Sequence, residues 1–326
     1  MSITVDVSIL SGRKTSVKAD LDSTAQALKR SAQTALGVGN SQLLDSSGSV
    51  LHEQSTLKKF KLQTGDSLTL YIHKVQLCGT KSIFLEVRSD FVAALGDGSV
   101  KIWGGLWHDA TSAAHDQLRN VLQVQASEQA FAIILADGSV ATRGDKDCGG
   151  DSSAVQDELK DVQHIQATFG AFAAILGDGS VVTWGDAEDG GDSNAVQNQL
   201  KNVQRIQATD HAFASILGDG SVVTWGDESH GGNSSAVQDK LKKVQQIQAS
   251  SFAFAAILDD GSVVTWGEAT HGGNSSAVQD QLKNVRQIQR TFAAFAAILS
   301  DGSVVTWGSE DHGGDSSAVQ DELRNM

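Results

Sequence analysis

One motif recurs at a nearly fixed spacing through most of this 326-residue chain, and the spacing limits the fold more than any other feature. Its clearest copies read Phe-Ala-Ala-Ile-Leu-x-Asp-Gly-Ser-Val-Val-Thr-Trp-Gly, and successive copies begin 40 or 41 residues apart. A fixed period indicates a repeat architecture, in which each unit buries its apolar surface against its neighbours. The copies begin at Phe91, Phe131, Phe172, Phe213, Phe254 and Phe295.

Each unit predicts three short strands. In the third copy, residues 162–167 alternate apolar and polar side chains, which indicates a strand with one wet face. Residues 172–176 are almost continuously apolar, as in a strand covered on both faces. Asp178 and Gly179 offer the positive φ angles that a tight hairpin needs, and the β-branched and aromatic residues 181–184 predict the third strand.

A loop rich in Asp and Gly follows the third strand, and the segment after it predicts a short helix. Ser152–Leu159 begins with a capping serine and carries acidic residues, and Val155 and Leu159 stand at i, i+4 spacing. The predicted unit is therefore three strands and a helix of about two turns.

Three short antiparallel strands cannot bury both of their faces alone, so each sheet must stack on the next. Units of about 40 residues with Asp-Gly hairpins are typical of propeller blades. We therefore expect a mostly β chain with a β-propeller of six repeats over residues 74–326 and short helices between the blades. An open, screw-like solenoid of the same units is the alternative.

The sequence Val-x-x-Ile-x-Ala followed by the motif resembles the regulator-of-chromosome-condensation repeat, which also occurs in large ubiquitin ligases of the HERC type. The resemblance covers roughly residues 77–326. It implies a propeller that usually has seven blades, with the Trp-Gly strand packed between blades. This chain has six copies, and Arg143 replaces tryptophan in the second, so ring closure stays open. The other copies carry Trp103, Trp184, Trp225, Trp266 and Trp307 at that position.

Residues 1–73 follow a different pattern. Residues 3–9 and 15–19 alternate as two strands of a hairpin, and an N-cap at Asp22 or Ser23 precedes a helical spacing of apolar residues that ends at Gly37. Further short strands are predicted at Leu43–Leu44, Val50–Leu51 and Leu68–Ile72. This order resembles the ubiquitin-like β-grasp fold, an α+β domain.

The resemblance to ubiquitin implies a recognition face more than a transferable tag. Conjugation in that family needs a free terminal Gly-Gly, whereas here residues 72–75 continue into the next domain. Leu44 and Tyr71 align with the apolar patch of ubiquitin and are the candidate partner-binding residues. The alternative, that Leu44 belongs to the hydrophobic core, is equally favoured.

Charge is distributed unevenly along the chain. Residues 1–76 carry 9 basic and 6 acidic residues, whereas the remainder carries 16 and 33, for a net charge of −14. An acidic domain repels phosphate backbones, so we expect no nucleic-acid binding and favour protein partners with basic surfaces.

The apolar runs are too short to span a bilayer, and the N-terminus predicts no cleaved signal. Peripheral docking on a membrane complex stays open. Cys78 and Cys148 are the only cysteines, which fits a reducing intracellular compartment.

No residue pattern predicts a cofactor, a metal or a catalytic group. Calcium favours acidic loops, but the spacing here matches no known calcium loop, and solvated turns are the favoured interpretation. Histidines recur before Gly-Gly on successive repeats, where they would not converge on zinc, and Cys148 has no His-Asp partner at a diagnostic spacing. The acidic candidates are Asp145, Asp147, Asp151, Asp186, Asp189 and Asp192, and the histidines are His230, His271 and His312.

The leading hypothesis for function is a non-catalytic protein-interaction scaffold, or a subunit of a larger assembly, because near-identical units offer a broad surface and no single cleft. The family resemblance also permits a regulator that exchanges guanine nucleotide on a small GTPase. The pairing of the two modules suggests a substrate adaptor in a ubiquitin pathway as a further alternative.

Overall fold

The computed structural model describes residues 2–9, 11–38, 41–52, 55–72, 76–79, 90–94, 100–104 and 121–323. Its contacts divide the chain into two units. Unit 1 comprises Met1–Gly79 and Asp90–Val124, and unit 2 comprises Thr80–Ser89 and Gln125–Met326. The domain boundary expected between residues 73 and 74 lies outside the described residues, so it stays a prediction.

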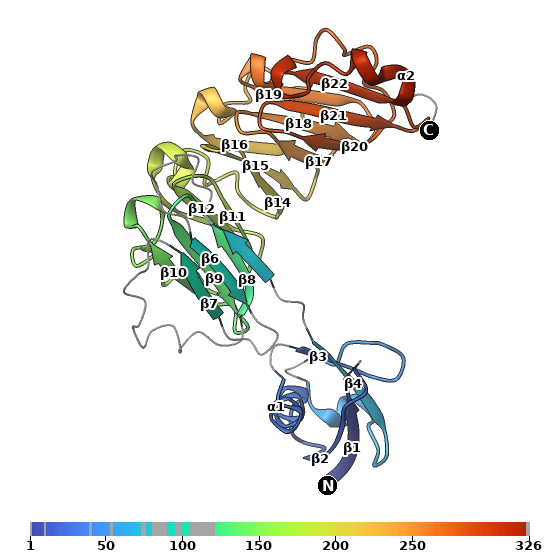
Figure 1. Cartoon of the computed structure of the whole chain (residues 1–326). Coiled ribbons are helices and arrows are strands. Elements are labelled where there is room, and N and C mark those ends of the chain that lie inside the picture. Colours follow the sequence, from blue (N-terminus) through green and yellow to red (C-terminus); the bar gives the residue numbers. More distant parts are fainter. Residues whose placement is uncertain are drawn as a thin grey trace. The chain divides into compact units, whose positions relative to one another are not determined.

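A four-stranded sheet with the order β2-β1-β4-β3 opens the chain. Its strands are β1 (Ser2–Ser8), β2 (Lys14–Asp20), β3 (Ser41–Leu44) and β4 (Ser67–Ile72). The central strands β1 and β4 run parallel, and β2 and β3 flank them antiparallel. Figure 1 shows the helix α1 (Ala25–Leu36) beside this sheet. The helix contributes Leu28 and Ala32 to the same buried cluster as the strands. A short helical turn, η1 (Leu57–Phe60), precedes β4.

The structure confirms the predicted hairpin and helix and corrects two details. Thr24 is the N-cap of α1 in place of Asp22 or Ser23, because its side-chain oxygen accepts a hydrogen bond from the Ala27 backbone N–H. Gly37 ends the helix in the left-handed region, at φ 61°. The strand predicted at Val50–Leu51 is wrong, since only an isolated bridge joins Val50 to Leu44.

Six three-stranded antiparallel sheets follow, one for each copy of the motif, and we number them repeats 1 to 6. Repeat 1 has β5 (Gln76–Gly79), β6 (Asp90–Ala94) and β7 (Val100–Gly104), repeat 2 has β8 (Val121–Ala126), β9 (Ala130–Leu135) and β10 (Val140–Gly144), and repeat 3 has β11 (Val162–Ala167), β12 (Ala171–Leu176) and β13 (Val181–Gly185). Repeat 4 has β14 (Val203–Ala208), β15 (Ala212–Leu217) and β16 (Val222–Gly226), repeat 5 has β17 (Val244–Ala249), β18 (Ala253–Leu258) and β19 (Val263–Gly267), and repeat 6 has β20 (Val285–Arg290), β21 (Ala294–Leu299) and β22 (Val304–Gly308). The mostly β repeat fold expected from the sequence is therefore confirmed.

In repeats 2 to 6, glycine alone supplies the left-handed residue of the hairpin between the second and third strands. Gly179 has φ +80°, whereas Asp178 keeps an ordinary negative φ. The Asp178 carboxylate instead accepts hydrogen bonds from the backbone N–H and the hydroxyl of Ser180, at 2.9 and 2.6 Å. The aspartate therefore fixes the turn through its side chain and not through its backbone conformation.

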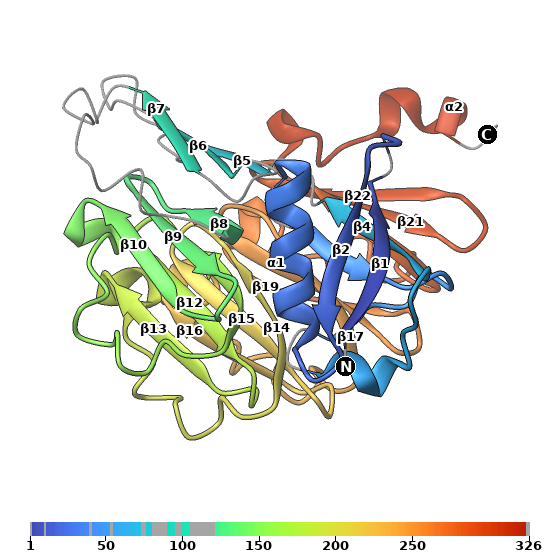
Figure 2. The ribbon, with the colours of Figure 1, turned by 90° about the horizontal axis from the view of Figure 1, so that it is seen from below.

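Four apolar cores lie between consecutive sheets of repeats 2 to 6. Figure 2 shows the ribbons of these successive sheets. Between repeats 3 and 4, one sheet contributes Ala173 and Ile175, and the next contributes Phe213 and Trp225. Phe213 is fully buried and stacks on Trp225, with ring centroids 5.2 Å apart. Burial of such a side chain contributes about 1.5–3 kcal/mol, so these junctions hold the repeats together. Stacking of this kind is consistent with a propeller-like repeat fold.

The helix predicted at Ser152–Leu159 is wrong, because this segment forms consecutive turns. Gln156 donates from Nε2 to the Val140 carbonyl at 3.0 Å, and Leu159 is buried in the core between repeats 2 and 3. These two contacts hold the segment along the outer strand β10, so the segment does not form a regular helix.

Short helical turns occur elsewhere, in the Asp- and Gly-rich loops. They are η3 (Lys146–Cys148), η4 (Ala187–Gly191), η5 (Glu228–His230), η6 (Ala269–His271) and η7 (Glu310–His312), and in repeat 6 the segment after the loop also forms η8 (Ser317–Val319) and α2 (Gln320–Leu323).

Candidate functional site

In repeats 3 to 6, two loops meet at one end of each sheet, and we call this end the loop edge. The first loop joins the first and second strands, and the second loop follows the third strand and holds the helical turn (Figure 1). In repeat 4, the Thr209 hydroxyl donates to the His230 carbonyl at 3.0 Å, and the Asp227 N–H donates to the His211 carbonyl at 2.9 Å. These bonds hold the two loops side by side.

A row of aromatic and imidazole rings runs along the loop edge, which we call the ring row. His211 contacts His230 at 4.4 Å between ring centroids, and His230 stacks on Phe252 at 4.7 Å. Phe252 lies 4.3 Å from His271. The complete ring row is Phe169, His211, His230, Phe252, His271, Phe292 and His312.

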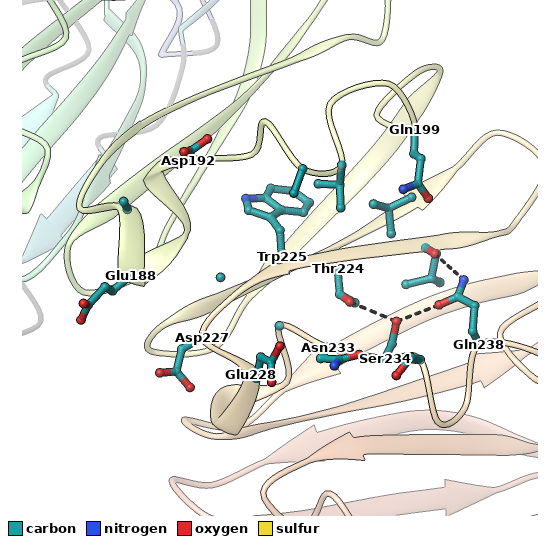
Figure 3. Close-up of a pocket in the computed structure, with 18 residues that line it drawn as sticks. Glu188, Asp192, Gln199, Thr224, Trp225, Asp227, Glu228, Asn233, Ser234 and Gln238 are labelled. Atoms are coloured by element: carbon teal, nitrogen blue, oxygen red, sulfur yellow. Dashed lines mark hydrogen bonds between the residues drawn. The ribbon is translucent and has the colours of Figure 1, made fainter.

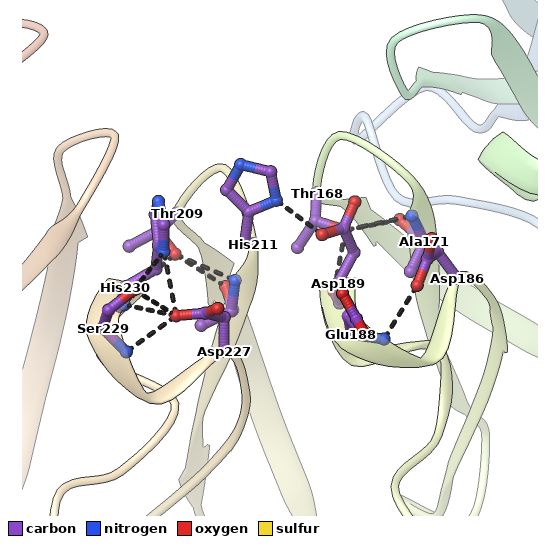
Figure 4. Close-up of polar contacts among 11 residues, drawn as sticks. Thr168, Ala171, Asp186, Glu188, Asp189, Thr209, His211, Asp227, Ser229 and His230 are labelled. Carbon is purple, nitrogen blue, oxygen red and sulfur yellow. Dashed lines mark hydrogen bonds and ion pairs between the residues drawn. The ribbon is translucent and has the colours of Figure 1, made fainter.

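His211 is ion-paired within the ring row. Its Nδ1 lies 2.5 Å from Asp189 Oδ1, which belongs to the second loop of the preceding repeat (Figure 4). This hydrogen bond raises the pKa of His211 above 6.5. Partial burial lowers the pKa, but the negative charges of Asp189 and Asp210 raise it further, so the net shift is upward. Burial and then the charge of Asp189 raise the pKa of Glu128, which belongs to repeat 2.

Asp227 is the most strongly perturbed carboxylate of the loop edge. Burial by itself raises its pKa, but hydrogen bonds from Ser229 and His230 outweigh burial and lower the pKa to about 2. His230 Nδ1 lies 3.0 Å from Asp227 Oδ1 (Figure 4). The carboxylate therefore stays ionised throughout the physiological range.

The second loops of repeats 3 to 6 and the residues of the ring row between them carry many carboxylates and no Lys or Arg. The opposite ends of the sheets hold both signs, as in the ion pair of Lys243 with Asp259 at 3.1 Å. The second loops are thus acidic and lie beside accessible aromatic rings, and Arg290, exposed at the end of β20, is the arginine next to the first loop of repeat 6. The carboxylates of the loop edge are Asp186, Glu188, Asp189, Asp192, Asp210, Asp227, Glu228, Glu268, Glu310, Asp311 and Asp315.

A groove of about 810 Å³ opens beside the loop edge, between the second loop of repeat 3 and strand β16 of repeat 4 (Figure 3). Trp225 and Thr224 form part of its wall, and Glu188 and Glu228 lie along it. The Thr224 and Ser234 hydroxyls lie 3.0 Å apart, and this pairing fixes the groove floor. Related grooves of about 450 and 490 Å³ lie beside β19 and β22.

The predicted acidic candidates are mostly turn-forming residues. Asp145, Asp151, Asp186 and Asp192 each accept a hydrogen bond from the backbone N–H two residues ahead, at 2.8–2.9 Å. Asp189 instead pairs with His211. Within the part of the chain that the structure describes, no group of three or more potential ligands is placed to hold a metal ion.

Cys148 lies half-buried beside the loop edge, in η3. Burial, followed by the negative charges of Asp145 and Glu128, raises its pKa to about 11. A thiol reacts as its thiolate, which is scarce near neutral pH at such a pKa. This environment disfavours a nucleophilic role.

Leu44 and Tyr71 lie on neighbouring strands and on the same face of the N-terminal sheet. The register pairs Leu44 with Thr69 and Gln42 with Tyr71, whereas Leu43 and Leu70 point to the core on the other face. Leu44 is half-buried and Tyr71 is 37% exposed. The role of this face in partner binding stays a prediction.

Sequence reasoning found the recurring histidines His230, His271 and His312 of the ring row and missed His211 and the phenylalanines. Phe169 and Phe292 occupy one position of the first loop, whereas His211 and Phe252 occupy the next position. The rings therefore have no fixed period in the sequence. Only the folded loops bring both positions into one row.

The pairing of His211 with Asp189 predicts a pH-dependent contribution to stability. Because the folded-state pKa is raised, the contribution is fully present below pH 6.5 and is lost as pH rises through the folded pKa. We therefore expect His211→Gln to destabilise the protein most in mildly acidic solution and progressively less above pH 6.5. Urea unfolding over this range measures the difference.

Asp189→Asn provides the matched control, because it removes the other member of the same pair. It should cause a similar loss, and the double variant should add little, since both changes break one interaction. Parallel pH profiles of wild type and His211→Gln would contradict this account.

In the described ranges, no helix is both long and apolar enough to cross a membrane. No protein-family model matches the sequence, and no curated protein matches it.

Solved structures give distant matches. Human WBSCR16 is 17% identical, with 68% of this chain and 74% of that chain covered and a TM-score of 0.45. Yeast RCC1 (Prp20), in its complex with Kap60, is 16% identical, with 59% and 56% covered and a TM-score of 0.41. The ubiquitin-like domain of Plasmodium falciparum Dsk2 is 19% identical, with 22% and 96% covered and a TM-score of 0.21. All three scores lie below 0.5, so the fold description rests on the sheets and cores of this chain.

Proposed function

We propose that this chain is a non-catalytic protein-interaction scaffold whose loop edge binds basic segments of partner proteins. The observation that carries the proposal is the ring row, flanked by carboxylates without a neighbouring Lys or Arg in the second loops. Repeats 3 to 6 all contribute to it, so a partner contacts several units at once.

The chemistry of the loop edge favours arginine and lysine side chains. A cation over an accessible aromatic face gains about 0.5–1 kcal/mol at an exposed site, and Phe292 is 41% exposed. Nearby carboxylates add attraction and speed the encounter between surfaces of opposite charge. Asp227 is held by Ser229 and His230, so it keeps its position before a partner arrives.

The grooves beside the loop edge provide room for an extended segment. The groove beside β16 is lined by Glu188 and Glu228 and by the apolar surface of Trp225. An arginine stem can lie on the apolar wall while its guanidinium reaches the carboxylates. The proposed binding mode is therefore a basic segment along the loop edge with a side chain in the acidic groove beside β16.

Fluorescence anisotropy with a labelled peptide of alternating arginine and glycine tests the proposal. We expect saturable binding that weakens as salt rises, and no binding of a glutamate-glycine peptide of the same length. Equal binding of the two peptides, or none of the basic one, would refute it.

Paired variants place the binding on the loop edge. Glu188→Gln with Glu228→Gln removes two carboxylates of the groove beside β16 and should weaken binding about three- to tenfold. Asp239→Asn with Asp280→Asn removes the same charge at exposed positions outside the loop edge, so this control should retain affinity. An equal loss in both pairs would indicate only general charge attraction.

We also propose that the N-terminal domain is a ubiquitin-like module. The mixed sheet with parallel β1 and β4 at its centre and α1 packed on it supports this proposal. Leu44 and Tyr71, which share the outward face, are its proposed recognition residues. The HERC-type likeness, the exchange-factor hypothesis and the ubiquitin-pathway hypothesis stay predictions from the sequence.

A further inference from the structure

The sheet of repeat 6 presents a face whose equivalents in repeats 2 to 5 are covered. Ile298 is 39% exposed, whereas its counterpart Ile175 in repeat 3 is 6% exposed. Ala296 and Val304 are partly exposed, whereas the corresponding Ala173 and Val181 are buried. We call this face the terminal cradle, and define it by Phe292, Ala296, Ile298, Gly302, Val304 and Gly313.

Gly313 lies at one corner of the terminal cradle and leaves open space beside it. At the four junctions between repeats 2 to 6, a phenylalanine ring fills the corresponding space. A Cβ added at Gly231 would lie 2.7 Å from the Phe254 ring of the next repeat. A Cβ added at Gly313, which has nearly the same backbone conformation, would meet nothing within 4 Å. The space beside Gly313 therefore corresponds to the space beside Gly231 that the Phe254 ring fills.

The same corner lacks a tryptophan hydrogen bond. Trp225 Nε1 donates to the Gly190 carbonyl of the preceding repeat at 3.1 Å, and Trp266 Nε1 donates to Gly231 at 3.0 Å. Trp184 and Trp307 repeat this contact at 3.0 Å. Among the described residues, none donates to the Gly313 carbonyl.

Backbone groups of the terminal cradle are also open. At the internal junctions, the carbonyl of the hairpin glycine accepts a hydrogen bond from the backbone N–H of the first valine of the next repeat. For example, the Val244 N–H donates to the Gly220 carbonyl at 2.8 Å. The N–H of Ser251 likewise donates to the Phe292 carbonyl of the next repeat at 3.0 Å. Within the described ranges, Gly302 O receives no such bond and Phe292 N–H makes none. The open groups match those of a sheet junction in kind and position.

These features specify the occupant, which is a sheet that pairs a phenylalanine with a tryptophan on adjacent strands. Repeat 1 has this register, since β6 and β7 pair Phe91 with Trp103 as β12 and β13 pair Phe172 with Trp184. Phe91 is 44% exposed, whereas the motif phenylalanines of repeats 2 to 6 are at most 1% exposed. Repeat 1 therefore combines the required strand register with an exposed motif phenylalanine.

We propose that the terminal cradle binds repeat 1 of a second copy of this chain, so that molecules associate head to tail. Phe91 of one molecule fills the space beside Gly313 of the next and covers Ile298. Such an interface joins two different surfaces, so it leads to a closed ring or an open chain of molecules. Covering apolar area that each copy exposes supplies the driving force.

Sedimentation velocity over a wide concentration range tests the association. We expect the mass of the wild type to rise above the 34.2 kDa monomer as concentration increases. Ile298→Glu places a charge in the terminal cradle, and Gly313→Ala narrows the space for the phenylalanine ring, so both should remain monomeric. Val50→Glu alters an equally exposed apolar residue, at 45%, outside the terminal cradle and should associate as the wild type does.

A mixing experiment identifies the two surfaces. Ile298→Glu keeps a functional repeat 1, and Phe91→Glu keeps a functional terminal cradle, so each is monomeric alone and their mixture should form a dimer that grows no further. Gly313→Ala replaces Ile298→Glu if circular dichroism shows that the glutamate variant is misfolded. The proposal is wrong if the wild type stays monomeric at every concentration, whether or not its own first repeat fills the terminal cradle. A mixture that forms no dimer would also overturn it.

Discussion

Phe213→Ala is expected to lower the free energy of unfolding by about 3–5 kcal/mol. Phe213 is fully buried between repeats 3 and 4, where it stacks on Trp225 and lies against Gly190. The variant loses the transfer free energy of the ring and leaves a cavity that two rigid sheets cannot close. Denaturant unfolding followed by tryptophan fluorescence and circular dichroism measures the loss.

Phe292→Ala is the matched control for this prediction. The same atoms are removed, but Phe292 is 41% exposed and lies outside the cores between sheets, so less apolar surface returns to water and no enclosed cavity forms. We expect a clearly smaller loss than for Phe213→Ala. Equal losses in the two variants would show that the junctions are not the main source of stability.

Gly231→Ala is expected to destabilise the chain by about 2–4 kcal/mol, for two reasons. Gly231 has φ +92°, a conformation that costs alanine about 1–2 kcal/mol. The added Cβ would also lie 2.7 Å from the Phe254 ring, which is itself fully buried and cannot retreat without overpacking the core. Denaturant unfolding at low protein concentration gives the value.

Gly313→Ala separates the two contributions. Gly313 has φ +90° and nothing within 4 Å of an added Cβ, so only the backbone cost of about 1–2 kcal/mol remains. The difference between the two variants therefore measures how tightly the phenylalanine packs. If Gly231→Ala costs no more than Gly313→Ala, the junction is looser than the structure indicates.

The strands of the repeats were predictable because their local pattern and their burial agree. Residues 172–176 are continuously apolar, and β12 is indeed covered on both faces. The helix predicted at Ser152–Leu159 is wrong because apolar residues at i, i+4 spacing can also anchor an irregular segment through tertiary contacts. Gln156 bonds to a strand carbonyl and Leu159 enters a core between sheets, and neither partner is local in the sequence.

The candidate site was predictable only in its charge. The excess of carboxylates after residue 76 is a property of composition, and it indicates basic partners before any folding is considered. The ring row depends on loops of successive repeats that meet in space, such as those of His211 and Asp189. The terminal cradle depends on which sheet face lacks a neighbour, and no residue of repeat 6 signals this in its own sequence.

Periodicity and composition were enough to predict the number of repeats, the three strands of each and the acidic character of the loops, because they act through local propensity and burial. The stacking of the sheets sets which rings touch, which histidine is paired with a carboxylate and which sheet face stays open. Those outcomes depend on contacts between residues about one repeat apart, such as Trp225 with Gly190, and such contacts exist only after the sheets have stacked.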